Sequence, residues 1–263
     1  MATRNNEGVE PLQQRDFISS LAKGLDVLRA FSKDNPQLST ADLANKLGIS
    51  RASARRFLLT LANLGYLHKE GQWFRPTSKV LSLSTVFLSS LPLASIAQPF
   101  LEAGTRRTEE SVSLGILEHN MLVFVAHSPS RWLLKLGIRA GWEIDAYVSA
   151  MGRVLLAALP DNELDRYLAA VELKPFTDKT VTSKARLRKL LADVRSQRYS
   201  VIDQELEPGL RSIAVPLAQN GRTIAAVGVG CLINRATLRR LKQEFLPAMR
   251  DVAAGIGEEI SRS

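Results

Sequence analysis

Residues 39–63 read STADLANKLGISRASARRFLLTLAN, and this stretch decides the fold of the N-terminal part of the chain. Ser39 is followed three residues later by Asp42, an acidic variant of the capping box that starts a helix. Gly48 ends this short helix, because glycine accepts the left-handed conformation found just past a helix end. Ser50 then caps a second helix. The stretch therefore predicts two capped helices joined by a tight turn.

The second of these helices, expected from about Arg51 to Asn63, has two different faces. Helical spacing of apolar residues predicts a buried side made of Ala54, Phe57, Leu58 and Leu61. The opposite side is mostly basic and polar, with small residues near its start that would allow close approach to base edges; it carries Arg51, Ala52, Ser53, Arg55, Arg56 and Thr60. This is a helix-turn-helix pattern, whose second helix enters the major groove of DNA. An ordinary helical hairpin with a cationic surface is the alternative.

A short β-hairpin is predicted directly behind this helix. Tyr66–His68 forms one strand, Glu70–Gly71 the turn and Gln72–Arg75 the return strand. A hairpin in this place is the wing of a winged helix, and Lys69 and Arg75 would reach phosphates or the minor groove. We therefore expect double-stranded DNA as a partner, contacted by Ser39, Thr40, Ser50, Arg51, Ala52, Ser53, Arg55, Arg56, Lys69 and Arg75.

The distribution of charge supports this expectation. The chain has 263 residues, a net charge of +9 and a pI near 9.9. Residues 46–79 contain seven Lys and Arg but only one acid, Glu70, so +6 of the net charge lies within 34 residues. A surface with so little acid favours nucleic acid over a merely solvated face.

Outside this stretch, the pattern predicts how the chain is divided. Residues 1–16 form a flexible arm. A first helix follows from about Phe17 to Lys33, ended by Asn35–Pro36. Its expected buried stripe is Ile18, Leu21, Leu25, Leu28 and Phe31. The winged helix-turn-helix domain spans 17–76, and an apolar connecting helix, 77–93, packs on a second subunit and is interrupted by Pro92.

The remainder, 94–263, mixes strands with helices. The expected helices are 96–110, 151–159, 161–171, 183–197 and a final helical stretch at 237–260, in which Pro247 marks a break or the start of a new helix. The expected strands are 112–116, 121–126, 132–136, 213–217 and 224–232, with turns at Glu118–Asn120 and Asn220–Gly221. Hairpins among helices predict an α+β domain on an antiparallel sheet.

Several classes of protein are excluded by what the sequence lacks. The longest apolar run, Ile224–Ile233, is too short to span a bilayer, and the polar N-terminus does not resemble a signal peptide, so we expect a cytoplasmic protein without membrane contact. No Gly-x-Ser-x-Gly, phosphate-loop or His-Glu-x-x-His motif occurs. With one cysteine and three histidines, we expect no metal and no cofactor.

The chain resembles the IclR family of bacterial regulators over residues 17–260. The resemblance lies in SLAKGLDVLRAF (20–31), in the block from Leu47 to Leu67, in SAMGRVLLA (149–157), and in DQELE (203–207) followed by GLRSIAVP (209–216). The arginine-rich helix and the DQELE run are most like the subgroup that senses protocatechuate and 4-hydroxybenzoate. The resemblance implies a GAF/PAS-like effector-binding domain and assembly as a dimer or a dimer of dimers.

The effector positions that the resemblance implies are Ala150, Met151, Leu210, Ser212, Gly228 and Gly230, with Asp203 close to another. From the residues themselves, the alternating Gly228 and Gly230 leave room on one sheet face, either for a ligand or for close packing of another backbone. Free N–H groups at the helix start near Ala150 would welcome a carboxylate. Arg211 and Arg153 are carboxylate partners or structural salt bridges.

Taken together, the sequence predicts a DNA-binding transcriptional regulator that responds to a small carboxylate effector, an aromatic acid, and controls aromatic-acid catabolism. The first alternative is an enzyme acting on a small aromatic acid, with an N-terminus that docks a partner. The second is a constitutive DNA-binding protein whose C-terminal domain only dimerises. Activation and repression both remain open.

Overall fold

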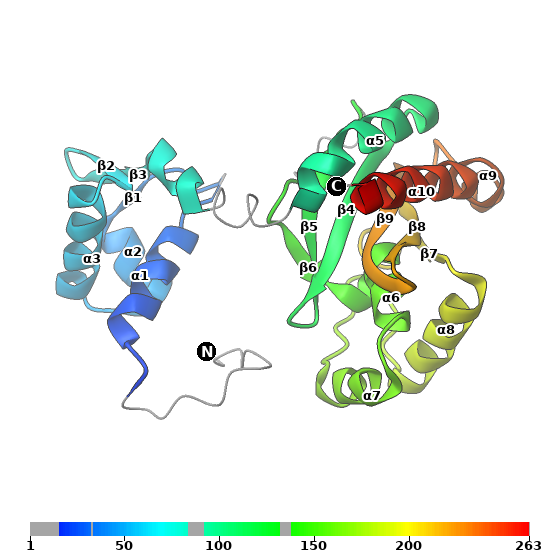
Figure 1. Ribbon diagram of the computed structural model, residues 1–263. Coiled ribbons are helices and arrows are strands. Elements are labelled where there is room, and N and C mark those ends of the chain that lie inside the picture. The colour runs from blue at the N-terminus through cyan, green and yellow to red at the C-terminus, as the bar shows by residue number, and fades with distance from the viewer. Residues whose placement is uncertain (1–15, 33, 84–91, 132–137, 263) are drawn as a thin grey trace. The chain divides into compact units, whose positions relative to one another are not determined.

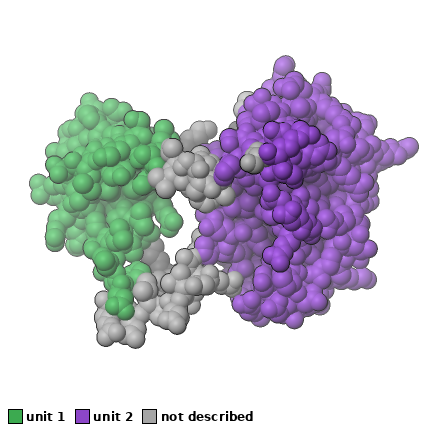
Figure 2. Space-filling view, viewed as in Figure 1, with its two compact units in different colours: residues 1–90 green, residues 91–263 purple. Residues whose placement is uncertain are grey.

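The chain folds as two units, residues 1–90 and 91–263 (Figure 2). The structure is a computed structural model that describes residues 16–32, 34–83, 92–131 and 138–262. The predicted arm and the predicted strand at 132–136 therefore lie outside the described residues, except for Asp16.

The described part of the N-terminal unit packs helices α1, α2 and α3 with a small sheet (Figure 1). Its strands pair antiparallel in the order β1-β3-β2. Its core is formed by Val27, Leu43, Leu58, Leu67 and Phe74. In chain order the elements are α1 (Ser19–Arg29), β1 (Leu38–Ser39), α2 (Thr40–Leu47), α3 (Arg51–Asn63), β2 (Leu67–Glu70), β3 (Trp73–Pro76) and the 3-10 turn η2 (Ser78–Val80).

Two expectations for this unit are corrected. Helix α1 ends at Arg29 rather than Lys33, since the chain turns through reciprocal backbone hydrogen bonds between Ser32 and Asn35. Its buried side is also rotated from the predicted stripe, because Val27 and Ala30 fill the core, whereas Ile18, Leu21 and Leu25 are exposed. Of the predicted connecting helix, 77–93, the structure describes the turn η2, a helical segment at 81–83 and, at 92–93, the start of the first helix of the C-terminal unit; residues 84–91 lie outside the description.

The C-terminal unit is built on a six-stranded antiparallel sheet of order β6-β5-β4-β9-β8-β7, which confirms the predicted α+β class. The strands are β4 (Ser111–Glu118), β5 (Met121–Ser128), β6 (Glu143–Asp145), β7 (Ser200–Asp203), β8 (Leu210–Gln219) and β9 (Arg222–Leu232). The helices and turns are α5 (Pro92–Thr108), the 3-10 turn η4 (Ala146–Val148), α6 (Ala150–Ala157), α7 (Asp161–Ala170), α8 (Lys184–Gln197), α9 (Leu238–Arg240), the π-helical η5 (Leu241–Phe245) and α10 (Leu246–Arg262).

The two faces of this sheet are covered by different helices. Helices α5 and α10 lie together against one face (Figure 1), where Val227 and Val229 of β9 join their core. Helices α6, α7 and α8 build a second core on the other face, which receives Ala214 and Ala226. Because strand side chains alternate between faces, Gly228 and Gly230 face α6.

The predicted hairpins are confirmed, with left-handed backbone at His119, Asn120, Asn220 and Gly221. Short strands β1, β6 and β7 were not predicted. The predicted final helical stretch is interrupted as expected at Pro247: the π-helical turn η5 precedes α10, and Pro247 is the second residue of α10.

Candidate functional site: a nucleic-acid interface and an internal cavity

The helix-turn-helix has the predicted caps. The Ser39 hydroxyl accepts a hydrogen bond from the backbone N–H of Asp42 at 3.3 Å, and the Asp42 carboxylate accepts one from the backbone N–H of Ser39 at 2.9 Å. Gly48 has the left-handed φ of 63° that ends α2, and the Ser50 hydroxyl caps α3 through the N–H of Ser53 at 3.2 Å. These contacts fix the angle at which α3 leaves the turn.

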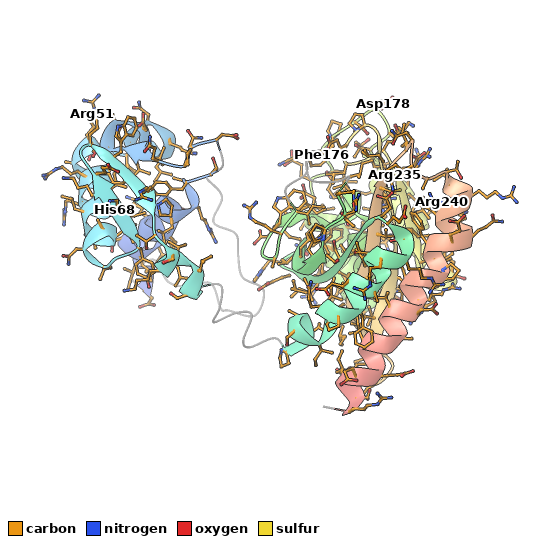
Figure 3. All side chains as sticks on the ribbon, turned by 90° about the horizontal axis from the view of Figure 1, so that it is seen from above. Arg51, His68, Phe176, Asp178, Arg235 and Arg240 are labelled. Carbon is orange, nitrogen blue, oxygen red and sulfur yellow. The ribbon has the colours of Figure 1, made fainter. Side chains whose placement is uncertain are left out.

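The cations at the start of α3 are not used inside the domain. Arg51, Arg55 and Arg56 are exposed, and none of them makes an ion pair or hydrogen bond with another described residue. Arg51 points outward from the N-terminal unit (Figure 3). Helix α3 has no acid in its first turn, so the charge of these guanidinium groups stays available to a partner.

Two other lysines of the basic stretch have structural roles. The Lys46 ammonium donates to the carbonyl of Ala30 at the end of α1, at 2.6 Å. The Lys79 ammonium donates to the carbonyl of Leu64 at 2.8 Å and lies 5.1 Å from the ring centre of Tyr66. The available charge is thus concentrated on α3 and the wing.

The wing presents one face to solvent. Cross-strand pairing sets His68 opposite Arg75 and Glu70 opposite Trp73, so these four side chains share a face, and all four are exposed. Phe74 faces the core on the other side. Lys69 is exposed as well, and neither Lys69 nor Arg75 has a partner among the described residues.

The C-terminal unit has a partly open cavity between its sheet and the start of α6. Of the predicted effector residues, the structure brings together Met151, Leu210, Ser212, Gly228 and Gly230 on its wall. A Cβ atom at Gly228 would lie 2.7 Å from Cγ of Met151, so this glycine lets the helix approach the sheet and leaves the space open.

Most of the cavity wall is apolar. It includes the rings of Phe124 and Trp142, whose centres are 5.4 Å apart. The polar wall residues are serines, and no described charged side chain lines the cavity. The remaining wall residues are Ser111, Ser113, Ile138, Ile144, Val148, Ser149, Ile202, Leu206 and Val229.

The start of α6 provides hydrogen-bond donors beside this cavity. The Ser149 hydroxyl caps the helix through the N–H of Gly152 at 3.5 Å. Gly152 is required sterically, because a Cβ atom there would lie 2.1 Å from the carbonyl oxygen of Ala146. The first-turn N–H groups of a helix lack intrahelical partners and carry partial positive charge, which favours an anionic group.

Three of the predicted effector residues do not line this cavity: Ala150, Asp203 and Arg211. The Arg211 guanidinium donates to the Asp203 carboxylate at 2.6 Å and to the carbonyl of Ala236 at 3.0 Å. Burial of the Asp203 carboxylate acts to raise its pKa, but the Arg211 guanidinium beside it favours the charged form. The net result is a lowered pKa for Asp203. Arg153, the other arginine considered for a carboxylate, is also paired inside the fold, with Glu205.

A histidine lies behind the cavity wall. Nδ1 of His127 is 2.9 Å from the hydroxyl of Ser113, which lines the cavity. Burial lowers the pKa of His127, so the ring is neutral at pH 7. A neutral ring nitrogen either donates to or accepts from the serine, so this pair sets which way the Ser113 hydroxyl points.

The aromatic part of the wall was missed by sequence reasoning. Phe124 lies on β5 and Trp142 precedes β6, far in sequence from the glycines of β9. Along β5, Phe124 alternates with residues that face the other core, so the strand pattern could predict which side of the sheet Phe124 faces. It could not predict which residues of other segments lie next to Phe124. Trp142 had no such signal, because β6 is only three residues long.

Comparison with known proteins agrees with this architecture. The IclR helix-turn-helix domain model matches residues 20–71, and the model of the bacterial transcriptional regulator IclR C-terminal domain matches residues 85–258. The chain belongs to the IclR family. Its members are transcriptional regulators, so this IclR-family chain is a transcriptional regulator, and its helix-turn-helix domain implies DNA binding.

Three relatives show how close the similarity is. The Pca regulon regulatory protein of Pseudomonas putida is 39% identical over 89% of this chain and 81% of its own. The p-hydroxybenzoate hydroxylase transcriptional activator of Acinetobacter baylyi is 35% identical over 93% of this chain and 92% of its own. A protein of known crystal structure from Rhodococcus sp. RHA1 is 40% identical, with a TM-score of 0.84 over 94% of this chain and 99% of that one.

Two further findings concern the described residues only. None of their helices is long and apolar enough to cross a membrane. No group of three or more His, Cys, Asp and Glu side chains among them is arranged to hold a metal ion.

Proposed function

We propose that this IclR-family regulator controls genes for aromatic-acid catabolism and that its effector is a small aromatic carboxylate bound in the cavity beside α6. The observation that carries the proposal is the make-up of that cavity. Two aromatic rings and aliphatic side chains suit a benzene ring, while serine hydroxyls and the start of α6 suit polar groups on the ring. The names of the Pseudomonas and Acinetobacter relatives point to the same substrate class.

DNA contact is assigned to exposed and half-buried residues of the helix-turn-helix and wing. Arg51, Arg55 and Arg56 are placed to reach base edges or phosphates, and Lys69 and Arg75 to reach phosphates or the minor groove. Ser39, Thr40, Ser50, Ala52 and Ser53 lie at or beside the starts of α2 and α3, where backbone and hydroxyl groups contact phosphate.

The chain acts as a homo-oligomer in this proposal. In the N-terminal unit, Leu21, Leu25 and Leu28 of α1 line an apolar groove open to solvent. Phe57 and Leu61 of α3, with Leu64 just after it, line the groove as well. A second copy covers this groove and doubles the recognition helices, as a two-fold operator requires. Replacing both Leu21 and Leu25 by Asp is expected to raise the monomer fraction in sedimentation velocity; an unchanged oligomer would place the interface elsewhere.

Binding rather than catalysis is the role of the cavity in this proposal. The described part of its wall has no acid, lysine, arginine or histidine to move a proton. The Ser113–His127 pair resembles two members of a hydrolytic triad, but no carboxylate among the described residues bonds to His127 as the third member.

The test is calorimetry with protocatechuate, 4-hydroxybenzoate and an aliphatic acid of similar size as control. We expect heat with at least one aromatic acid and none with the aliphatic acid. Ser212→Val is the matched variant, because Ser212 lines the cavity and the substitution removes a hydroxyl from its wall; we expect at least a tenfold loss of affinity with DNA binding of the ligand-free protein unchanged. No heat with any aromatic acid, in protein that binds DNA selected from its own genome, would overturn the effector proposal.

A further inference from the structure

The two stretches that carry the clearest signature of the C-terminal unit meet in space. Arg153, in the first turn of α6, pairs through both terminal nitrogens with the carboxylate of Glu205, at 2.9 and 2.5 Å. The side chains are only 3% and 11% exposed, so the pair lies inside the protein. A bidentate pair in a region of low dielectric is both strong and strict in geometry.

Further hydrogen bonds attach this pair to two other segments. Nε of Arg153 donates to the carbonyl of Tyr147 at 2.8 Å. The carboxylate of Glu205 also accepts the N–H of Val181 at 3.2 Å, and its backbone carbonyl accepts the hydroxyl of Thr180 at 2.6 Å. Three stretches that are distant in sequence, near residues 147–153, 180–181 and 205, are thereby held together.

Each anchor lies next to residues of the cavity wall, although neither charge reaches the cavity. Met151 and Ser149 line the cavity on the Arg153 side, and Leu206 lines it on the Glu205 side. The wall on these two sides is therefore formed by chain segments whose separation is set by the ion pair. Because Glu205 neutralises Arg153, that guanidinium is not available to a carboxylate ligand.

We propose that Arg153 and Glu205 are a positioning pair for the effector cavity. They hold the start of α6 and the turn between β7 and β8 at the distance that an aromatic ligand requires between Met151 and Leu206. The proposal rests on the cavity being the effector site. Ligand affinity then depends on two residues that never touch the ligand.

The test compares Glu205→Gln and Arg153→Lys with Leu187→Val, all in the full-length protein. Glu205→Gln keeps the size and shape of the side chain but removes its negative charge. Arg153→Lys keeps the positive charge but removes the guanidinium group that makes two parallel hydrogen bonds to the carboxylate. Leu187 is buried in the same core without lining the cavity, so Leu187→Val controls for general loss of stability. The readouts are amide hydrogen exchange without ligand, calorimetry with 4-hydroxybenzoate and protocatechuate, and thermal unfolding.

We expect the backbone amides of residues 147–153, 180–181 and 203–210 to exchange at least tenfold faster in Glu205→Gln than in Leu187→Val. The two variants are compared under conditions in which their global free energies of unfolding are equal. The affinity of Glu205→Gln for the bound acid falls at least tenfold, and Arg153→Lys lies between it and the wild type. Exchange and affinity no different from Leu187→Val would overturn the positioning role. If Glu205→Gln does not fold, the same comparison is made with Arg153→Lys.

The two proposals fail in different ways. Wild-type protein that binds neither acid contradicts the proposed effector class, while the exchange comparison, which needs no ligand, still decides whether the pair positions the wall. Wild-type binding with unaltered affinity in both variants contradicts the positioning role alone.

Discussion

The arginines of the two units are used in opposite ways. On α3, Arg51, Arg55 and Arg56 lie in water without a partner among the described residues. In the C-terminal unit, Arg153 and Arg235 each pair with a largely buried carboxylate, Glu205 and Glu110 respectively. The basic charge of the chain alone therefore does not locate the DNA surface; what sets α3 apart is that three exposed arginines without a described partner lie together on one helix.

The physical reason lies in the cost of burying charge. An exposed guanidinium keeps its water, so leaving it unpaired costs the fold little, and it can exchange counterions for DNA phosphates. A buried one needs a carboxylate in good geometry, since an unpaired charge inside a protein is strongly unfavourable. Pairing thus separates the buried arginines, which stabilise the fold, from exposed ones that stay available to a partner.

Breaking a buried pair is the largest expected effect. Arg235→Met leaves the fully buried Glu110 without its charged partner, and we expect the free energy of unfolding of the C-terminal unit to fall by about 3–5 kcal/mol at pH 7. Urea unfolding measures it. The control is Glu244→Gln, which breaks the exposed Arg240–Glu244 pair and costs no more than about 0.5 kcal/mol. Equal losses in the two variants would erase the distinction between buried and exposed pairs.

Removing an unpaired arginine gives the opposite result. Arg51→Ala, and separately Arg56→Ala, leave stability unchanged but weaken DNA binding by about 1–3 kcal/mol if the side chain reads a base. A lost phosphate contact instead lowers the slope of log affinity against log salt by about 0.9. Arg188→Ala, at an exposed arginine of the other unit that pairs with Asp165, is the control. Unchanged binding and unchanged slope in both α3 variants would show that α3 is not the contact surface.

Sequence reasoning worked best where local signals decide the structure. The Ser39–Asp42 box, Gly48 and Ser50 each act within one turn of chain, so the bounds of α2 and α3 could be predicted closely. The two-residue turn at Asn220–Gly221 did the same for β8 and β9. The pocket-facing glycines followed from alternation along a single strand.

It failed where tertiary contacts decide. The stripe from Ile18 to Leu25 has helical spacing, but spacing cannot tell an apolar face buried in its own unit from one left open along a groove. Arg211 lies within the family signature, but its pairing with Asp203 depends on cross-strand register between β7 and β8. Glu205 gave no sign of pairing with Arg153, because 52 residues separate them.

A cap of the recognition motif should have a smaller effect than either arginine. Ser39→Ala removes the acceptor for the Asp42 N–H and half of the capping box, and we expect the N-terminal unit to lose about 1 kcal/mol of stability. Ser39→Gly should cost only a few tenths, because glycine is itself tolerated at this position. Thermal unfolding followed at Trp73 measures both. A larger loss for Gly than for Ala would mean that backbone freedom, not the hydroxyl, limits this helix start.

The smallest expected effect is a pH dependence confined to the C-terminal unit. Burial lowers the pKa of His127 below its ordinary value of 6.5, so the folded protein resists a proton that the unfolded chain accepts. The contribution to stability is complete above about pH 6.5 and is lost as the pH falls below it. Unfolding midpoints at pH 7.5, 6.5 and 5.5 should therefore decline more in the wild type than in His127→Gln, which cannot take up that proton. His68→Gln, at the exposed histidine of the wing, should leave the decline as in the wild type. An equal decline in His127→Gln would mean that His127 is not the group responsible. The buried histidine would then contribute no more to the pH dependence of stability than the exposed histidine of the wing.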